Sequence, residues 1–433
     1  MSRPSMPPYG SARRGEGASD GCDTVRPNKE FMIPSPPGPT CWSGSVTIAG
    51  VCQTEQGDLS GRSPAHVWWE VVAGACADAG LTLQDIDGVV GEGPPGVGLR
   101  GHMPGAGIAE QLGRPLRFHA SSEAGAARTL AGVSLAAHAL TSGLADAVVI
   151  ATVAAGQGGG YGSADREAAV AHMAKLSGPY EYVLGTTRVS DYAIYATRHM
   201  HRYGTTAEQL AEIAVTQRYA ATLHPLSVNG RKGPITVDDV LASPLIADPL
   251  HRLDCCLVNQ GAGAIVLTRT SDVLPSAGHR PVVLCGYGEG HSHIDPNAVE
   301  DMTTSPAAKL AAESAFQKAG VTRSEVDVAG ISDHFTIGVI LGLEDAGFCR
   351  PGEGGSFVQN GGTGLQGHLP TNTSGGHLSF SHAGMCAIFT AIEVVEQLRG
   401  EAGARQVPKA DLGFVTGVGG AQQACAAAVL AGI

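Results

Sequence analysis

The chain has 433 residues, of which 43% are hydrophobic, and its formal net charge at pH 7 is −12. A chain of this length can bury a large core, and about 150 residues per domain predicts roughly two or three structural units. The acidic balance argues against nucleic acid or an anionic membrane surface as the main partner. No apolar run approaches the roughly 20 residues of a membrane-spanning helix, so we expect a soluble, cytoplasmic protein.

The cysteines are scattered along the chain, without the paired spacing of a disulfide framework or a zinc site. Cys76, Cys386 and Cys425 stand in apolar helical surroundings that suit reduced, buried thiols. The sequence therefore predicts neither a disulfide scaffold nor a structural metal.

The first 43 residues are rich in Pro, Gly, Ser and Arg and show no apolar periodicity, which predicts a disordered N-terminal extension, residues 1–43. Folded structure is expected to begin just after it. The first predicted strand is Ser45–Val51, a short β-prone run between glycine-containing segments.

An internal repeat organises the rest of the chain. The segment Ala79–Asp87 recurs as Ala319–Asp327, and each copy is followed by an apolar strand, Gly88–Gly91 or Val328–Ile331. Each copy also ends a helix at a glycine and passes through a short turn. The sequence therefore predicts a duplication.

A second correspondence supports the repeat. The Ala-rich run Ala126–Ser142 leads into the strand Ala147–Ala151, and the run Ala387–Leu398 leads into Leu412–Thr416. This alternation predicts an α/β protein whose helices pack on a mostly parallel sheet. Helices so poor in charge are expected between sheets, away from solvent.

These patterns divide the chain into two expected halves, residues 44–270 and residues 281–433. The first half contains an expected inserted loop or cap region, about residues 156–254, which has many tyrosines and basic residues. Two helices are predicted within it, Asp191–Tyr203 and Ala207–Ala221.

The loop 371–384 is the strongest candidate for a catalytic element. Gly375 and Gly376 allow backbone angles closed to other residues, and the loop brings His382 to the predicted start of a helix. A helix N-terminus lowers the pKa of a histidine and favours the neutral base at pH 7. His382 is therefore the predicted general base; the alternative is a polar turn before a core helix.

Other histidines are candidate metal ligands. His291 and His293 form a His-x-His pair, and His368, His377 and His382 follow later in the chain. No carboxylate or cysteine at ligand spacing completes this set, so no metal site is expected. His293 is instead expected to line the substrate pocket.

Several short motifs follow one another in the second half, and their order is more specific than any one of them. They are Asp333–Thr336, Leu343–Cys349, Gly352–Gly355, the loop 371–384 and Gln397–Gly400.

With the duplicated halves, this set of motifs resembles the thiolase superfamily, in its branch of sterol-carrier and lipid-transfer thiolase-like proteins. The resemblance covers about Ser45 to the C-terminus. It implies a five-layer αβαβα fold with two duplicated halves, a homodimer and an acyl-CoA substrate. Coenzyme A is then part of the substrate, and no other bound cofactor is expected.

Catalysis in this superfamily uses a cysteine at the start of a buried helix in the first half and a histidine at the equivalent place in the second. Ser122 occupies the position of the cysteine, three residues before Gly125, and His382 occupies that of the histidine. A second family cysteine, in a glycine-rich loop, is also replaced, and Gly419 and Gly420 lie in that loop.

The resemblance and the loop pattern together place Gly376, Gly419 and Gly420 at the expected substrate-binding surface. Ser122 cannot simply inherit the role of a cysteine, because a serine hydroxyl stays protonated without a strong base. Two alternatives remain open for it. Ser122 is acylated with the help of His382, or it only fills the space that the cysteine left.

Cleavage of a carbon–carbon bond next to a thioester needs an enolate but no acyl-enzyme, so the remaining residues suit retro-aldol chemistry. Steroid side-chain aldolases belong to the same branch, and they place tyrosines where this chain has Ser332 and His382. His382 is the first candidate for the base, with Asp333 and His334 as partners. The alternatives are a structural carboxylate for Asp333 and simple packing for His334.

Three functions therefore stand as expectations. The first is a retro-aldol acyl-CoA lyase acting on a bulky, steroid-like or lipid-like substrate. The second is an acyltransferase that uses Ser122 as its nucleophile. The third is a non-catalytic subunit or scaffold of an acyl-CoA-processing complex, and a zinc-ribbon and OB-fold partner protein is expected in the first and third cases.

Overall fold

The computed structural model describes residues 43–96, 103–156, 187–273, 278–294 and 296–433. The predicted N-terminal extension up to residue 42 and the start of the predicted insertion, residues 157–186, lie outside the described residues. No helix among the described residues is long and apolar enough to cross a membrane.

Strands of both halves join in one sheet of nine strands in the described part of the chain, ordered β3-β2-β4-β7-β1-β8-β11-β10-β9. The halves meet where Thr47 and Ile48 pair with Val283 and Val282. The strands are β1 Val46–Gln53, β2 Gly88–Val90, β3 Phe118–Ala120, β4 Ala147–Ala154, β7 Gly261–Arg269, β8 Val282–His291, β9 Val328–Gly330, β10 Leu412–Gly419 and β11 Ala424–Gly432.

The strand order confirms the predicted duplication. In the first half β2 runs parallel to β4, and β4 and β1 flank β7 antiparallel. In the second half β9 runs parallel to β10, and β10 and β8 flank β11 antiparallel. The prediction of a mostly parallel sheet was wrong, because most strand pairs are antiparallel. In the second half the reason is the short connection from β10 to β11, which only an antiparallel pair can use.

The recurring segments also make the same contacts in the two halves. Asp87 accepts hydrogen bonds from the backbone amides that begin β4, with 3.0 Å to the nitrogen of Ala147. Asp327 does the same at the start of β10, with 3.0 Å to the nitrogen of Leu412. Each aspartate thus fixes a helix-to-strand turn against the neighbouring strand, which explains why the repeat is visible there.

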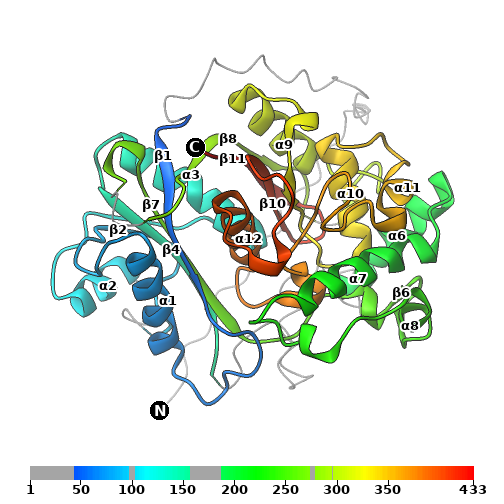
Figure 1. The fold of residues 1–433 in the computed structure, drawn as a ribbon, viewed down its shortest axis with the longest axis horizontal. Helices are drawn as coiled ribbons and strands as arrows, with labels where there is room; N and C mark the ends of the chain where they lie inside the picture. Colours follow the sequence, from blue (N-terminus) through cyan, green and yellow to red (C-terminus); the bar gives the residue numbers. More distant parts are fainter. Residues whose placement is uncertain (1–42, 97–102, 157–186, 274–277, 295) are drawn as a thin grey trace, which may run out of the picture. The chain divides into compact units, whose positions relative to one another are not determined.

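Five layers follow one another in Figure 1: an outer helix layer, the strands of the first half, the helices between the halves, the strands of the second half, and a second outer helix layer. Helix α1 packs on one side of the first half, and α9 and α10 lie on the second half. Helices α3 and α12 lie between the halves and contact strands of both, as their low charge predicted. The main helices are α1 Pro64–Asp78, α2 Pro104–Leu112, α3 Arg128–Thr141, α6 Arg188–Tyr203, α7 Ala207–Thr222, α8 Val237–Leu241, α9 Pro306–Ala319, α10 Thr336–Ala346, α11 Gly354–Val358 and α12 Ala387–Arg399.

The described part of the insertion holds both predicted helices, α6 and α7, followed by α8 and a two-stranded hairpin of β5 (Leu245–Ala247) and β6 (Leu250–His251). Helix α6 is tied to the turn after β10. The hydroxyl groups of Tyr192 and Tyr195 donate to the backbone carbonyls of Gly420 and Ala421, at 3.3 and 3.2 Å. The insertion therefore helps to position the glycine-rich loop.

Candidate active site

The predicted catalytic loop is built around the carboxylate of Asp333. The loop makes a single π-helical turn, Gly376–Phe380, and Asp333 accepts the backbone amides of His377 at 2.8 Å and Leu378 at 3.2 Å. A Cβ on Gly376 would lie 2.2 Å from a carboxylate oxygen of Asp333. Glycine is thus required here for the close approach of the carboxylate.

His382 does not begin a helix, and that prediction was wrong. The residue lies in a segment without regular secondary structure, and α12 begins only at Ala387, with Cys386 as its N-cap. The pKa of His382 is nevertheless lowered, to about 3, first because burial disfavours the charged ring and then because His377 is close. The ring is therefore neutral at pH 7, for a reason other than the helix dipole.

A segment of the first half fixes His382 in place. The side-chain oxygen of Asn259 accepts a hydrogen bond from the backbone nitrogen of His382 at 2.9 Å. The backbone of Leu257 hydrogen-bonds to the His382 ring, and its amide donates to the carbonyl of His377 at 3.0 Å. Sequence reasoning missed Asn259, because nothing in its surroundings marks it as a neighbour of a loop more than a hundred residues away.

Three histidines meet at this place. The ring centroid of His334 lies 5.1 Å from that of His377 and 5.2 Å from that of His382, and the last two are 5.8 Å apart. Burial lowers the pKa of all three rings, which are neutral at pH 7. His334 and His382 keep some exposed surface, so a ligand can reach them.

Cys386 adds a thiol to this histidine cluster. Its sulfur lies 3.6 Å from Nε2 of His334, and burial raises the pKa of the thiol. The other ring nitrogen of His334, Nδ1, is buried and has no hydrogen-bond partner among the described residues. From the sequence, Cys386 was predicted only as a buried core thiol. The signal that could have identified its role is its spacing of four residues from His382.

Ser122 lies in the loop between β3 and a short 3-10 turn that leads into α3. It lines a cavity of about 100 Å³ together with Arg128, Thr152, Gly384 and Met385. Gly384 and Met385 stand two and three residues after His382, so the cavity reaches the end of the predicted catalytic loop. Within the described residues, no hydrogen bond joins the hydroxyl of Ser122 to the His382 ring.

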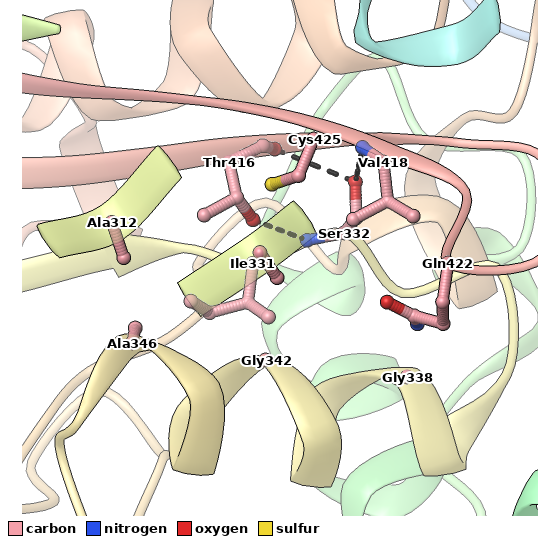
Figure 2. A pocket seen from close by; sticks show the side chains of 11 residues that line it. Ala312, Ile331, Ser332, Gly338, Gly342, Ala346, Thr416, Val418, Gln422 and Cys425 are labelled. Carbon is pink, nitrogen blue, oxygen red and sulfur yellow. Dashed lines mark hydrogen bonds between the residues drawn. The ribbon is translucent and has the colours of Figure 1, made fainter. Parts of the chain in front are cut away.

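Ser332 is fully engaged elsewhere. Figure 2 shows its side chain directed at β10, where the hydroxyl donates to the carbonyl of Thr416 at 3.4 Å and accepts from the amide of Val418 at 2.9 Å. On the other side lies a gap of about 10 Å³, lined in part by Gly338 and Gly342 of α10. A buried hydroxyl that is bonded twice to the backbone suits a structural role.

The glycine-rich turn after β10 meets the first half. A Cβ on Gly419 would lie 2.2 Å from the carbonyl oxygen of Ala124, so the turn rests directly on the backbone of the Ser122 loop. Gly420 follows with a φ of +66°. His293 lies at the same turn, with its Nε2 3.3 Å from the carbonyl oxygen of Ala421.

Comparison with known proteins agrees with this architecture. The chain is 34% identical to an acetyl-CoA acetyltransferase of Methanothermobacter thermautotrophicus, over 87% of this chain and 96% of that protein. It is 32% identical to a steroid side-chain-cleaving aldolase of Thermomonospora curvata, over 81% of this chain and 90% of the relative. The chain belongs to the thiolase superfamily. Residues 288–432 match the family described as thiolase C-terminal domain-like.

Solved structures of thiolase-superfamily members show the same fold. The structure described as the Ltp2-ChsH2(DUF35) aldolase matches with a TM-score of 0.78 and 28% identity, over 90% of this chain and 98% of that one. An acetyl-CoA acetyltransferase from Syntrophomonas wolfei matches with a TM-score of 0.64 and 16% identity, over 90% and 100% of the two chains. The thiolase-like α/β fold expected from the sequence is thereby confirmed.

Proposed function

We propose that this thiolase-superfamily enzyme cleaves a carbon–carbon bond of a bulky acyl-CoA thioester in a retro-aldol reaction. The observation that carries the proposal is the pair of partly exposed, neutral imidazoles of His334 and His382 in a chain that has serine, at Ser122, in place of the nucleophilic cysteine. Relatives support it: besides the aldolase of Thermomonospora curvata, a protein of Mycobacterium tuberculosis named 17-hydroxy-3-oxo-4-pregnene-20-carboxyl-CoA lyase is 32% identical over 83% of this chain.

In the proposed reaction, neutral His382 removes the proton of the β-hydroxyl group. The electron pair of that O–H bond forms the new carbonyl group, the carbon–carbon bond breaks, and its electrons form the enolate of the shorter thioester. The imidazolium of His382 then donates its proton to the enolate carbon. This step returns His382 to its neutral form and releases the shorter acyl-CoA. No covalent acyl-enzyme is needed.

We assign His334 to the enolate oxygen. The ring nitrogen assigned to this role is Nε2, which lies next to the Cys386 sulfur, because Nδ1 is buried; the neutral ring then carries its single proton on Nε2. The N–H group of a neutral imidazole can donate a hydrogen bond to an oxygen on which negative charge develops, and it does so without transferring its proton. Gly419 and Gly420, and the neighbouring His293, are assigned to substrate binding around it.

Asp333 has a positioning role in this proposal. Its carboxylate accepts two backbone amides of the loop that ends at His382, so its negative charge holds the loop in shape. Gly376 serves the same arrangement by admitting the carboxylate.

The experiment is an assay of carbon–carbon cleavage, with 17-hydroxy-3-oxo-4-pregnene-20-carboxyl-CoA as the first substrate, and with intact-protein mass spectrometry of the same samples. We expect a shorter acyl-CoA and a ketone to form, no acyl adduct on the protein, and Ser122→Ala to keep kcat/KM within about 3-fold of the wild-type value. A stable adduct that disappears in Ser122→Ala would instead establish the acyltransferase.

The acyltransferase remains the second candidate because of one observation, the place of Ser122 in the wall of the cavity that reaches the His382 loop. The scaffold remains the third. It would be favoured if no thioester is turned over, even with a partner protein present.

The pH profile tests the proposed state of His382. With a pKa of about 3, the base stays neutral between about pH 5 and 8, so its protonation should not reduce kcat/KM in that range. An ordinary histidine would lose about 30-fold by about pH 5. Burial raises the pKa of Asp333 to about 7, so an inflection near that pH belongs to Asp333. We expect Asp333→Asn to remove such an inflection; a fall of about 30-fold that persists in Asp333→Asn would contradict the assignment.

We also propose that the chain forms a homodimer and that it binds a zinc-ribbon and OB-fold partner protein. The homodimer is supported by β3, which lies at one edge of the sheet and, among the described strands, pairs only with β2. A zinc-ribbon and OB-fold partner is supported by the structural relative, whose description names a DUF35 component. Light scattering of the purified chain, alone and after co-expression with such a partner, measures both.

A further inference from the structure

We propose that His334, His382 and Cys386 form a binding site for one zinc ion. One ligand atom of each residue, a ring nitrogen or the sulfur, lies within 4.8 Å of those of the other two. The sequence predicts no metal site, because its set of candidate histidines includes neither His334 nor a cysteine. The fold brings together His334, from the segment between β9 and α10, and His382 and Cys386, from the segment before α12.

The best-defined distance fits tetrahedral coordination. Zinc bonds of about 2.3 Å to sulfur and about 2.0–2.1 Å to nitrogen, at a tetrahedral angle, place the two ligand atoms about 3.6 Å apart. The sulfur of Cys386 and Nε2 of His334 are 3.6 Å apart. These two atoms therefore already stand at the separation that a shared zinc ion requires.

The third ligand is held in a suitable state. The backbone of Leu257 hydrogen-bonds to the ring of His382, and a neutral ring that donates one N–H to a carbonyl presents the lone pair of its other nitrogen. Metal-binding histidines usually have such a partner, which fixes the tautomer and the ring orientation. His382 thus has the backbone support typical of a ligand.

His377 is not part of the site, although it is the third ring of the cluster. Its Nε2 lies 3.3 Å from the hydroxyl of Thr390, and its Nδ1 lies 3.1 Å from a carboxylate oxygen of Asp333. Three protein ligands then leave one tetrahedral position for water or a substrate oxygen, as in catalytic zinc sites. The carboxylate of Asp333 is near enough to raise the pKa of the Cys386 thiol, and the same negative charge favours a cation.

Binding exchanges one ion for one proton. Zinc displaces the proton of the Cys386 thiol, which passes to solvent, and the sulfur binds as a thiolate. The ion also takes the lone pair of His382 that the proposed reaction uses as a base. Zinc occupancy and proton abstraction by His382 therefore exclude each other.

The test uses Co²⁺ as a spectroscopic probe for zinc, with full-length protein first stripped by a chelator. We expect one equivalent to bind and to give the intense visible bands of tetrahedral Co²⁺ with a thiolate-to-cobalt charge-transfer band in the near ultraviolet. In Cys386→Ser the charge-transfer band should disappear and the affinity should fall at least about 100-fold. One equivalent of Zn²⁺ should displace the cobalt from the wild-type protein.

The matched control is Cys76→Ser, which changes another fully buried thiol, in α1, and should keep one equivalent and both bands. His334→Gln, a second variant at the site, covers the case in which Cys386→Ser does not fold. Two results would overturn the proposal. One is that the wild-type protein binds no cobalt, and the other is that Cys386→Ser and His334→Gln give the same Co²⁺ spectrum as the wild-type protein. The readout needs no substrate, so failure of the zinc site and failure of the proposed reaction are observed separately.

Discussion

His382→Ala is expected to lower kcat/KM for carbon–carbon cleavage by about 10²–10⁴, the range that a positioned general base contributes. The loss should appear in kcat, because the neutral ring acts on a proton that moves only in the transition state. Steady-state kinetics with the 17-hydroxy-3-oxo-4-pregnene-20-carboxyl thioester measure it.

His291→Ala is a suitable control, because this histidine is at the surface at the end of β8, 61% exposed, beside Glu289. It should stay within about 3-fold of the wild-type kcat/KM. Wild-type activity in His382→Ala would remove His382 from the mechanism and leave the reaction without its base. Loss of all activity in both variants would instead point to a general effect on folding, which circular dichroism detects.

Arg405→Met is expected to lower the free energy of unfolding by about 3–5 kcal/mol, the cost of leaving one member of a buried ion pair alone. The guanidinium of Arg405 lies 2.9 Å from carboxylate oxygens of both Glu393 and Glu396. Burial by itself would raise the pKa of Glu393, but the Arg405 charge outweighs burial and the pKa is lowered. Without that charge, the buried carboxylate of Glu393 must take up a proton or remain unpaired.

Urea denaturation of wild-type, Arg405→Met and the double variant Arg405→Met/Glu393→Gln measures this effect. The double variant should recover part of the lost stability, because it removes the unpaired carboxylate. Arg350→Met is the surface control, since Arg350 is 87% exposed and its variant should stay within about 0.5 kcal/mol. A change of less than about 1 kcal/mol in Arg405→Met would show that the pair is dispensable.

The ion pair also reaches the candidate site. Glu393 accepts a hydrogen bond of 2.7 Å from the hydroxyl of Thr373, at the start of the loop that carries His382. Since Thr373 precedes Gly376 by three residues, the charged cluster anchors one end of the loop while Asp333 holds its middle. Part of the lost stability in Arg405→Met should therefore be local to the loop, which hydrogen exchange can resolve.

The sequence predicted the halves of the fold well, because duplication leaves a local signature. The turns at Asp87 and Asp327 recur with their contacts, and helices α3 and α12 correspond to the two runs that lead into the strands Ala147–Ala151 and Leu412–Thr416. The direction of the strands was less accessible. Whether β7 and β11 run parallel or antiparallel to their neighbours depends on connections, and one of these passes through the insertion.

Within the site, the lowered pKa of His382 was easier to predict than the surroundings of its ring. His382 was found from its loop, and its pKa is indeed lowered, but the expected cause, a helix N-terminus, was replaced by burial against His377. Asn259 and Leu257, which hold the histidine, belong to the other half. Contacts between segments so far apart depend on the packing of the two halves, and a single sequence holds no record of that packing.

The contact of Gly419 with Ala124 limits which substitutions the two halves of the fold can accept independently. Because the backbone of one half rests on the backbone of the other at this point, no side-chain exchange in the first half can make room for a larger residue at position 419. The sequences of the outer helices can therefore change independently in the two halves. At the contact of Gly419 with Ala124, a change in one half requires a matching change in the other. Separately expressed halves would each expose that seam and lack a complete site.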